Sequence, residues 1–542
     1  MSRVRLPEGR HFALTWSIPD SFGGMTDAML RRCGAFRRVA GVEVDVLTFD
    51  ARPDTPDVER MLRERGVLAA GVRITNLYDW LRRHPLPGGS LQIDRDAFTP
   101  LALEDATEAT EAIEVRRRGD LVMSRARLAA DGETLQTDHY RADGTLLLSD
   151  RRDTRQRGTI GGRSVVLCDA NGRPVRSWRR MRSLYRAWLD ALTAGEPSFI
   201  IIDSKTMAPL MLDYRRPHVV TAHVVHASHR STATSATTAT SATAPAAAPA
   251  TDPHPIRRSR REALERLDDF DLVAVLSRRQ RDDLEQIVGR RDHLVVIPNP
   301  RPLPAPEPSR AAPGPRDPAR GVVLAALTRR KRVSHAIAAA QGANARPGVA
   351  VHLDVYGDGE SRPALERRVT DATAVEFHGF DPDARQCLAD ASFLLLTSHS
   401  EGFPLVLVEA MAAGCLPIAY DIPYGPADLI RDGRNGFLVP PGDVEGLADA
   451  IVRLQRMPPR RVARMRSSAV RTARRFDEER VTRLWARELH RAAVRREVRR
   501  TGRFGRARAA AARLPLPRPV RTAGLTVVAA IDRATRRFGR VG

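Results

Sequence analysis

Cysteine is scarce in this chain, and its placement excludes a disulfide framework and a structural zinc site. The four cysteines, Cys33, Cys168, Cys387 and Cys415, are scattered along 542 residues. They form no C-x-x-C pair, and no histidine lies at zinc-finger spacing from them. The sequence therefore predicts reduced, buried thiols.

Long apolar runs are also missing. The best candidate, GLTVVAAI at residues 524–531, is far shorter than the roughly 20 residues of a bilayer span. The N-terminal residues MSRVRLPEGRHFAL lack the apolar core of a signal peptide. We therefore expect a cytoplasmic protein.

Lysine is nearly absent although the chain is strongly basic. Lys205 and Lys331 are the only lysines, against a formal net charge of +23. Such an arginine bias indicates a GC-rich coding sequence more than selected contacts with nucleic acid, which is not an expected partner. Residues 491–542 hold 15 arginines against Glu497 and Asp532. This basic tail predicts either contact with an anionic polymer or membrane surface, or a solvated tail with no partner.

Alternating strand and helix patterns predict two α/β domains. Between the halves of the first, short segments joined by ADG and NG turns predict an antiparallel β-rich insertion. The low-complexity residues 231–254 are expected to form a disordered loop. The expected divisions are 1–84 and 181–298 for the first domain, 85–180 for the insertion, 299–320 for a Pro-rich linker, 321–490 for the second domain and 491–542 for the tail.

A pair of glycines follows the first predicted strand. Gly23 and Gly24 lie in IPDSFGGMTDAM, where the chain turns from the strand into a helix. Because glycine has no side chain, the backbone there is able to approach a ligand. Thr26 or Asp27 is expected to cap the helix.

One carboxylate stands in an otherwise apolar helix. Residues 405–413, LVLVEAMAA, are apolar except for Glu409, which is typical of a helix buried on all sides. An ionised side chain there must be paired, hydrogen-bonded or protonated. Its neighbours three and four positions away are apolar. A partner for Glu409 is therefore expected from elsewhere in the fold or from a ligand.

The flanking residues predict an anion site. FLLLTS at 393–398 is typical of a buried parallel strand, HSEGF at 399–403 of a loop, and Pro404 suits the first helical position. Ligands of parallel sheets bind at the carboxyl ends of the strands, where helix N-termini present free N–H groups. Glu401 lies in this loop and is expected to face the same cleft as Glu409.

Residues 397–443, TSHSEGFPLVLVEAMAAGCLPIAYDIPYGPADLIRDGRNGFLVPPGD, resemble the donor-binding signature of family 4 glycosyltransferases. LTRRKRVSHAI at 327–337 and VYGDGESRPALE at 355–366 match upstream motifs, and the resemblance extends over 319–480. It implies the α/β GT-B fold class, in which two Rossmann-like domains face a cleft.

The first half adds a narrower resemblance. LTWSIPDSFGGMTDAML, HYRADGTLLLSD, FIIIDS and HVVHASH are similar to segments of bacterial poly(glycerol- or ribitol-phosphate) α-glycosyltransferases of wall teichoic acid. These enzymes carry a β-rich insertion in the first domain. Some relatives form trimers through it, so a homo-oligomer is an open expectation.

The family resemblance implies roles at the donor site. Glu409 would bind the ribose hydroxyls, and Glu401 the donor sugar, together with the backbone of Gly402 and Phe403. Lys331 would neutralise the departing diphosphate. The remaining implied contacts are the N–H groups of Leu405 and Val406 at the diphosphate, and the nucleotide-side loop with Gly357 and Gly359.

One position departs from the family pattern. Where the family has arginine in a GRL turn, this chain reads AAL, with Ala326 in the arginine's place. Either Arg329 or Arg330 replaces that arginine, or the enzyme is weakened or inactive.

The HVVHASH segment matches a family region with a histidine near the donor sugar. His226 and His229 are the candidates for a catalytic role, ahead of His223. The resemblance also implies retention of anomeric configuration and neither cofactor nor bound metal, with the UDP-sugar as donor substrate.

The predicted function is transfer of a hexose or N-acetylhexosamine from a UDP-sugar to a cell-envelope polymer with teichoic-acid-like polyol phosphate. The basic tail would contact the anionic acceptor, or the inner face of the membrane as a peripheral attachment. The alternatives are another capsular or exopolysaccharide glycosyltransferase, a sugar-nucleotide epimerase on the same fold, and an inactive polyanion-binding protein. The sequence leaves the donor sugar open.

Overall fold

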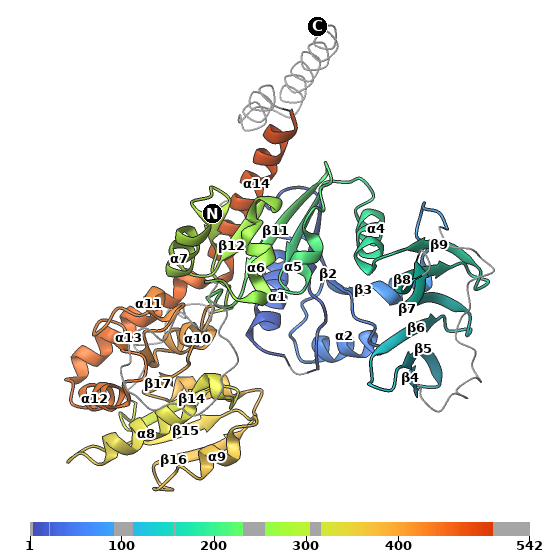
Figure 1. Cartoon of the computed structure of the whole chain (residues 1–542). Helices are drawn as coiled ribbons and strands as arrows, with labels where there is room; N and C mark the ends of the chain where they lie inside the picture. Colours follow the sequence, from blue (N-terminus) through green and yellow to red (C-terminus); the bar gives the residue numbers. More distant parts are fainter. Residues whose placement is uncertain are drawn as a thin grey trace. The chain divides into compact units, whose positions relative to one another are not determined.

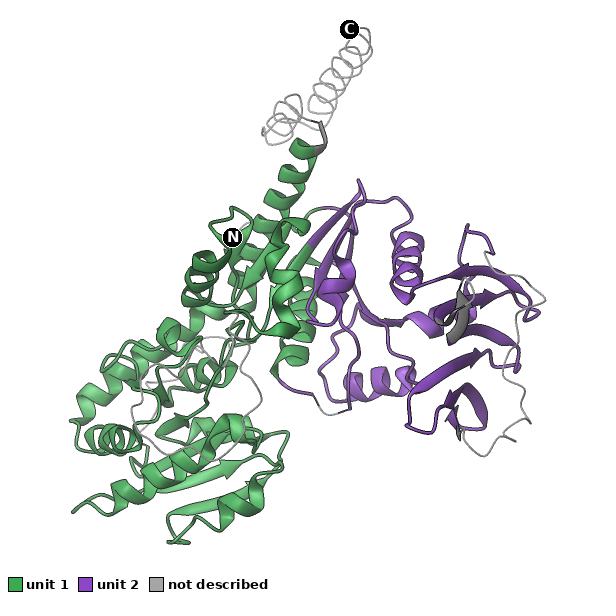
Figure 2. Cartoon of the chain, in the orientation of Figure 1, with its two compact units in different colours: residues 1–7, 24–41, 222–542 green, residues 8–23, 42–221 purple. Residues whose placement is uncertain are grey.

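The computed structural model describes residues 4–20, 22–91, 112–156, 159–230, 255–303 and 316–501 (Figure 1). The predicted disordered loop at 231–254, most of the predicted linker and the tail beyond residue 501 lie outside them. Contacts divide the chain into two compact units, one of residues 1–7, 24–41 and 222–542 and one of residues 8–23 and 42–221 (Figure 2). We call them unit 1 and unit 2.

The first Rossmann-like sheet has seven strands in the order β13-β12-β11-β10-β1-β2-β3. Its paired neighbours run parallel, as in β1 with β10 and β2. β10 (SFIII) and β11 are buried at every position, which is expected of parallel strands covered on both faces. Its strands are β1 Arg10–Leu14, β2 Val44–Thr48, β3 Val72–Asn76, β10 Ser198–Ile202, β11 Val219–Val225, β12 Leu272–Val275 and β13 Leu294–Val296.

The helices of this part begin where polar side chains satisfy free N–H groups. The side chain of Asn76 accepts from the N–H of Tyr78 and Asp79, and that of Ser277 accepts from Gln280 N–H. The helices are α1 Gly24–Ala35, η1 Phe36–Ala40, α2 Thr55–Glu64, α3 Leu77–Arg83, α4 Met181–Thr193, α5 Met207–Met211, α6 Arg258–Glu265, η3 Leu267–Asp269 and α7 Arg278–Val288.

The predicted β-rich insertion is confirmed as a six-stranded antiparallel sheet within unit 2, in the order β4-β5-β6-β7-β8-β9. Tyr140, Leu146, Val166 and Cys168 form a small apolar core on it. The strands are β4 Ala112–Arg118, β5 Leu121–Leu128, β6 Thr134–Tyr140, β7 Leu146–Gln156, β8 Thr159–Cys168 and β9 Pro174–Trp178.

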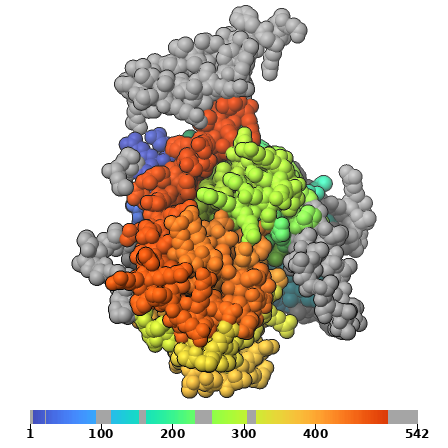
Figure 3. Space-filling view, turned by 90° about the vertical axis from the view of Figure 1, so that its left-hand side faces the viewer, coloured from blue at the N-terminus to red at the C-terminus, as the bar shows by residue number. Residues whose placement is uncertain are grey.

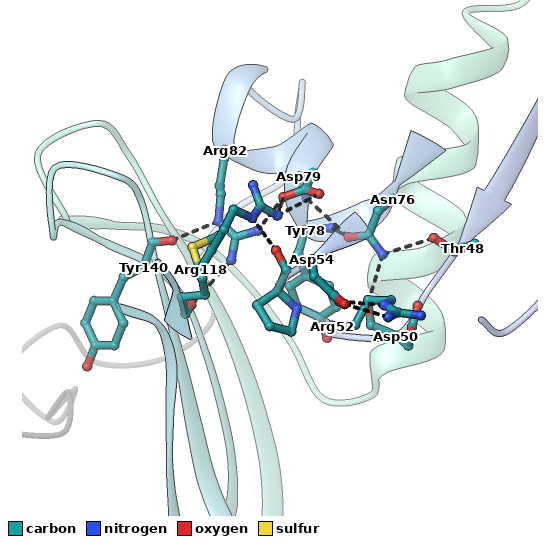
Figure 4. Close-up of polar contacts among 12 residues, drawn as sticks. Thr48, Asp50, Arg52, Asp54, Asn76, Tyr78, Asp79, Arg82, Arg118 and Tyr140 are labelled. Carbon is teal, nitrogen blue, oxygen red and sulfur yellow. Dashed lines mark hydrogen bonds and ion pairs between the residues drawn. The ribbon is translucent and has the colours of Figure 1, made fainter. Parts of the chain in front are cut away.

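Two arginines fix the insertion to α3. Arg82 donates to the carbonyls of Tyr140 (2.9 Å) and Met123 (3.3 Å) and pairs with Asp79. Arg118 of β4 pairs with the same Asp79 at 2.9 Å (Figure 4). The insertion is therefore attached to α3 by charge-assisted hydrogen bonds as well as by chain connectivity.

The second Rossmann-like sheet lies in unit 1 and has six parallel strands in the order β16-β15-β14-β17-β18-β19. β17 (FLLL) and β18 (LPIAY) are wholly buried. The strands are β14 Arg320–Leu324, β15 His352–Tyr356, β16 Val375–Gly379, β17 Phe393–Leu396, β18 Leu416–Tyr420 and β19 Phe437–Val439. The helices are η4 Arg329–Lys331, α8 Val333–Asn344, α9 Arg362–Glu366, η5 Ala384–Ala389, α10 Leu405–Ala413, α11 Pro426–Leu429, α12 Val444–Gln455, α13 Pro459–Ala473 and η6 Arg474–Phe476.

The last described helix, α14 Glu478–Thr501, crosses the boundary predicted at 490/491. Within unit 1, Trp485 of α14 packs on Phe36 and lies under Arg32, and Arg496 pairs with Asp271 at 2.7 Å. The first residues of the predicted basic tail are therefore part of the folded domain. Figure 3 shows α14 in red beside the orange residues of unit 1. Among the described residues, no helix is long and apolar enough to cross a membrane.

Candidate active site

The segment around Glu401 and Glu409 folds as the sequence predicts. β17 ends at Leu396, a loop follows, and α10 spans Leu405–Ala413 and ends at Gly414, whose φ is 78°. Pro404 is the residue before the helix rather than its first residue. The N–H groups of Leu405 and Val406 belong to the first turn, where a helix offers no acceptor of its own. They stay the predicted diphosphate contacts.

Glu401 forms an ion pair with Lys331, one of the two lysines of the chain. Lys331 Nζ lies 2.6 Å and Arg330 Nη1 3.2 Å from Glu401 Oε1, and Arg330 also donates to the carbonyl of Ser400. We call Glu401, Lys331 and Arg330 the Glu401 cluster. It joins η4, which follows β14, to the loop after β17. Two motifs 70 positions apart therefore meet, as the family resemblance implies.

The Glu401 carboxyl is held ionised. Burial by itself would raise its pKa, but Lys331 and Arg330 outweigh this and leave the pKa below its usual range. A ligand that separates this ion pair would meet both the carboxylate and the cation. The cluster therefore offers a cation to a phosphate and an anion to sugar hydroxyls.

Glu409 has two arginine partners from outside its helix. Arg301 Nη2 lies 2.7 Å and Arg385 Nε 2.9 Å from Glu409 Oε1. Arg301 also donates to Asp27 Oδ2 at 2.6 Å. These four residues are called the Glu409 cluster, and all belong to unit 1. Of the two sources expected for a partner of Glu409, the rest of the fold or a ligand, the fold supplies two arginines.

Two glycines allow the loops after β14 and β15 to touch. A Cβ on Gly357 would lie 1.9 Å from the carbonyl oxygen of Ala325, and one on Gly359 would lie 2.6 Å from that of Leu327. Both have positive φ, so the loop needs glycine for conformation as well as for space. Their predicted place on the nucleotide side remains a prediction.

Gly402 meets the histidine segment. A Cβ there would lie 1.9 Å from the carbonyl oxygen of His226 and 2.9 Å from Ala227 Cα. The loop that carries Glu401 therefore packs directly on the loop after β11. Phe403 is buried and packs on Phe476, so only its backbone is available to a ligand, in agreement with the implied role.

The two candidate histidines have different surroundings. His229 is fully buried, its ring stacks on Tyr424 with centroids 5.5 Å apart, and burial lowers its pKa to about 4. The N–H of Tyr424 in turn donates to the carbonyl of Glu401 at 2.9 Å. His226 is only half-buried. His229 therefore supports the Glu401 loop, and His226 is the better placed to meet a ligand.

The remaining predicted residues lie as follows. A Cβ on Gly23 or Gly24 would meet no atom within 4 Å, so packing does not require glycine there. Ala326 is exposed, and the side chain of Arg329 is exposed and has no partner among the described residues. Of the two arginines proposed to replace the missing family arginine, Arg330 is the one that reaches Glu401.

Sequence reasoning missed Arg301, Arg385 and the role of Asp27. Arg301 lies in the predicted linker, and Asp27 was expected as a cap, whereas it lies in the first turn of α1 and pairs with Arg31 and Arg301. No local pattern marks these residues, because their partners are distant in sequence. The one available signal was the need of Glu409 for a cation.

A second ionisable cluster was also missed, on neighbouring strands of the six-stranded sheet. Ligand atoms of His352, Asp354 and Glu376 lie within 4.8 Å of one another. Asp354 is paired with His378 at 2.8 Å and Arg320 at 3.1 Å. Arg320 supplies a positive charge beside Asp354, and His378 is a further hydrogen-bond partner. The cluster includes His352, the first residue of β15. The loop with Gly357 follows Tyr356, the last residue of that strand.

One region of the chain matches a known protein family. Residues 319–456 match the family of glycosyl transferases group 1, so the second Rossmann-like domain is a glycosyltransferase group 1 domain. It carries the Glu401 and Glu409 segment.

Two curated relatives extend the match. An exopolysaccharide phosphotransferase of Streptomyces coelicolor is 38% identical over 194 residues, which is 34% of this chain and 20% of that protein. A poly(glycerol-phosphate) alpha-glucosyltransferase of Bacillus subtilis is 25% identical over 215 residues, which is 38% of this chain and 30% of that protein. The chain thus spans less than a third of the length of these relatives.

Solved structures show the fold over most of the chain. Staphylococcus aureus TarM, solved with fondaparinux, alpha-GlcNAc-glycerol and UDP, superposes with a TM-score of 0.67 at 18% identity and covers 89% of this chain and 100% of its own. The chain therefore has the GT-B fold of TarM, with the antiparallel insertion in the first domain.

Proposed function

We propose that the chain is a retaining glycosyltransferase that transfers a hexose or N-acetylhexosamine from a UDP-sugar to a cell-envelope polymer of teichoic-acid-like polyol phosphate. The observation that carries the proposal is the ion pair between Lys331 and Glu401 in the loop before α10, the helix that carries Glu409. In this proposal Lys331 is the cation for the diphosphate, Glu401 is the carboxylate for the sugar, and Glu409 is the second carboxylate, for the ribose. No cofactor or resident metal takes part in this proposal.

The chemistry follows from these charges. The bond between the sugar C1 and the diphosphate oxygen breaks, and the acceptor hydroxyl oxygen bonds to C1 on the face that the diphosphate leaves. Lys331 and Arg330 would stabilise the negative charge on the leaving diphosphate, with the first-turn N–H groups of α10. The proton of the acceptor hydroxyl would pass to a leaving phosphate oxygen. Glu401 would orient the sugar, and His226 would contact it from the β11 loop.

The acceptor assignment is supported by the relatives. TarM was solved with alpha-GlcNAc-glycerol and UDP, and the Bacillus relative is named for poly(glycerol-phosphate). Residues 491–542 hold 15 arginines against Glu497 and Asp532, and this local positive charge favours a phosphate polymer as acceptor. We further propose that the basic tail contacts this polymer or the anionic inner face of the membrane.

The test is transfer of radiolabelled sugar from UDP-sugars to purified polyol-phosphate polymers, with the product anomer read by NMR. We expect transfer with retained configuration by the wild type. Glu409→Ala and Lys331→Ala should bind UDP weakly and transfer little. Donor cleavage with no transfer to any envelope polymer, or inverted product, would contradict the proposal.

A truncation that leaves α14 intact tests the binding role proposed for the tail. Because Arg495 and Arg496 contact Asp271, the deletion should begin at residue 502. The truncated protein should bind anionic vesicles or polymer less tightly at low salt, since arginine contacts to phosphates are salt-dependent. Unchanged binding would remove the tail from the proposal.

One observation bears on the inactive alternative. Ala326 stands where the family has arginine, but Arg330 reaches Glu401 from a position four residues later. The site therefore keeps two cations, which favours an active enzyme over a polyanion-binding protein. Complete absence of UDP binding by the wild type would favour the inactive alternative instead.

A further inference from the structure

Four side chains of the metal-ligand type lie on one face of two neighbouring strands. β15 and β16 pair at the edge of the second Rossmann-like sheet (Figure 1), with Asp354 opposite Glu376. Alternate residues of a strand share a face. His352 and Asp354 of β15 therefore lie together with Glu376 and His378 of β16. We call these four residues the β15–β16 cluster.

The ring of His352 is oriented by the backbone. Its Nδ1 lies 2.9 Å from the carbonyl oxygen of Thr373. A carbonyl oxygen only accepts hydrogen bonds, so the proton of the neutral ring is on Nδ1 and Nε2 carries a lone pair. A hydrogen bond from one ring nitrogen to a carbonyl, with the other nitrogen left bare, is typical of a histidine that binds a metal ion.

The bare nitrogen of His352 faces two carboxylates. Its Nε2 lies 3.4 Å from Asp354 Oδ1 and 3.6 Å from Glu376 Oε2. Both distances exceed the ~2.7–3.2 Å of an N–H···O hydrogen bond. A tetrahedral ion with ligand bonds of about 2.0–2.1 Å keeps its ligand atoms about 3.3 Å apart. The three ligand atoms lie within 4.8 Å of one another, so the cluster has the size of a transition-metal site.

The charges around the cluster also favour a cation. Arg320 Nε lies 3.1 Å from Asp354 Oδ2, and His378 Nε2 lies 2.8 Å from Asp354 Oδ1. In the part of the chain that the structure describes, the ion-pair neighbours of Glu376 are the two histidines of the cluster. Two carboxylates and one arginine leave a net negative charge when both rings are neutral.

We propose that His352, Asp354 and Glu376 bind one divalent transition-metal ion, with Zn²⁺ as the probe, because Zn²⁺ accepts both imidazole and carboxylate ligands. His378 is a positioning residue, since its Nε2–H holds Asp354 Oδ1. Water completes the coordination. The ligands are nitrogen and oxygen, unlike those of the cysteine site that the sequence excludes. The ion would tie the edge strand β16 to β15.

The proposed ion is separate from the donor site. His352 is the first residue of β15, and the loop with Gly357 follows its last residue, Tyr356. Four residues of parallel strand span about 13 Å. The inference therefore stands apart from the proposed function, and binding of the metal and binding of UDP are expected to fail independently of each other.

The test is calorimetric titration of Zn²⁺ into the full chain, purified without a histidine tag and stripped with a chelator. We expect one site in the wild type. His352→Ala and Glu376→Gln should each weaken Zn²⁺ binding at least about 10-fold, since even the loss of an outer-shell partner costs that much. His84→Ala removes an exposed histidine of unit 2 and should leave the affinity unchanged. Mg²⁺ prefers oxygen ligands alone and should not compete.

Two further measurements separate the roles of the residues from folding. His378→Ala should weaken Zn²⁺ binding about 10-fold, and His378→Gln, which keeps a donor for Asp354, should restore part of it. Hydrogen exchange of the β16 amides should slow when Zn²⁺ is added to the wild type, but not to His352→Ala. Because the side chain of Glu376 is 58% exposed, Glu376→Gln keeps the test valid if His352→Ala does not fold.

Two results would overturn the inference. Equal Zn²⁺ affinity of the wild type and both ligand variants would place the ion elsewhere. No Zn²⁺ binding by the wild type would leave the cluster as an ion-pair network around a protonated His352. UDP affinity, measured on the same proteins, should not change with His352→Ala. Absence of UDP binding alongside normal Zn²⁺ binding would count against the proposed function alone.

Discussion

The two carboxylate clusters of the site differ in what holds them. Lys331 and Arg330 come from the turn after β14, and both are more exposed than Arg301, at 18% and 51% against 4%. The Glu409 cluster reaches through Arg301 to α1. Glu401 is thus held by partly exposed cations from the turn after β14, whereas Glu409 is held by a buried arginine that also pairs with Asp27 of α1.

The largest expected effect is on stability and lies in the Glu409 cluster. Arg301→Leu leaves Asp27 and Glu409 as largely buried carboxylates without their buried cation. Breaking a buried pair in this way costs about 3–5 kcal/mol. Urea denaturation should show the loss, with Arg466→Leu as the milder control, because the buried Arg466 donates to Ser392 Oγ and its loss orphans no carboxylate. An equal loss of unfolding free energy in Arg301→Leu and Arg466→Leu would show that stranding the two carboxylates adds no cost.

The next effect is on catalysis and lies in the Glu401 cluster. Lys331→Ala should lower the rate of sugar transfer about 100-fold to 1,000-fold, as for loss of one charge-stabilising donor. Its unfolding free energy should fall less than that of Arg301→Leu, because Arg330 remains beside Glu401 as a second cation. Steady-state kinetics and urea denaturation measure both. Lys205→Ala is the matched control and should alter neither.

Gly402→Ala probes whether the Glu401 loop also depends on the β11 segment. The new Cβ would lie 1.9 Å from the carbonyl oxygen of His226, so the two loops must separate. We expect a loss of about 2 kcal/mol in unfolding free energy and weaker UDP-sugar turnover. Gly342→Ala, where the Cβ meets only Ala448 at 3.8 Å, should stabilise slightly. Equal changes in unfolding free energy for Gly402→Ala and Gly342→Ala would show that the loops do not touch.

The last expected effect is a pH dependence of stability at His229, next to the Glu401 loop. His229 has a pKa lowered to about 4 by burial, below its ordinary value of 6.5. The unfolded chain therefore binds a proton that the folded chain does not, and stability falls as pH decreases from 6.5 toward 4, by about 1.4 kcal/mol per unit. His229→Phe should flatten the stability profile in this range. The exposed His84→Phe should leave it unchanged.

Local patterns account for most of the fold and for the positions of the site motifs. α10, the buried parallel strands and the antiparallel insertion follow from periodicity and turn residues such as Gly414. The meeting of Lys331 with Glu401 came from the family resemblance. Arg301, Asp27 and Arg385 escaped prediction because a lone arginine carries no periodic pattern, and its partner is set by tertiary packing. α14 continues to Thr501, past the expected start of the basic tail at residue 491, and the arginine-rich sequence gives no signal for a domain boundary there.

The most direct test of the account is calorimetric titration of UDP into the wild type, Lys331→Ala and Glu409→Ala, with GDP and ADP as competitors. A donor site made by the two clusters predicts selective UDP binding that weakens at least about 10-fold in each variant, as expected for loss of a charged hydrogen bond. Equal UDP affinity in all three proteins would contradict the placement of the nucleotide at Glu401 and Glu409.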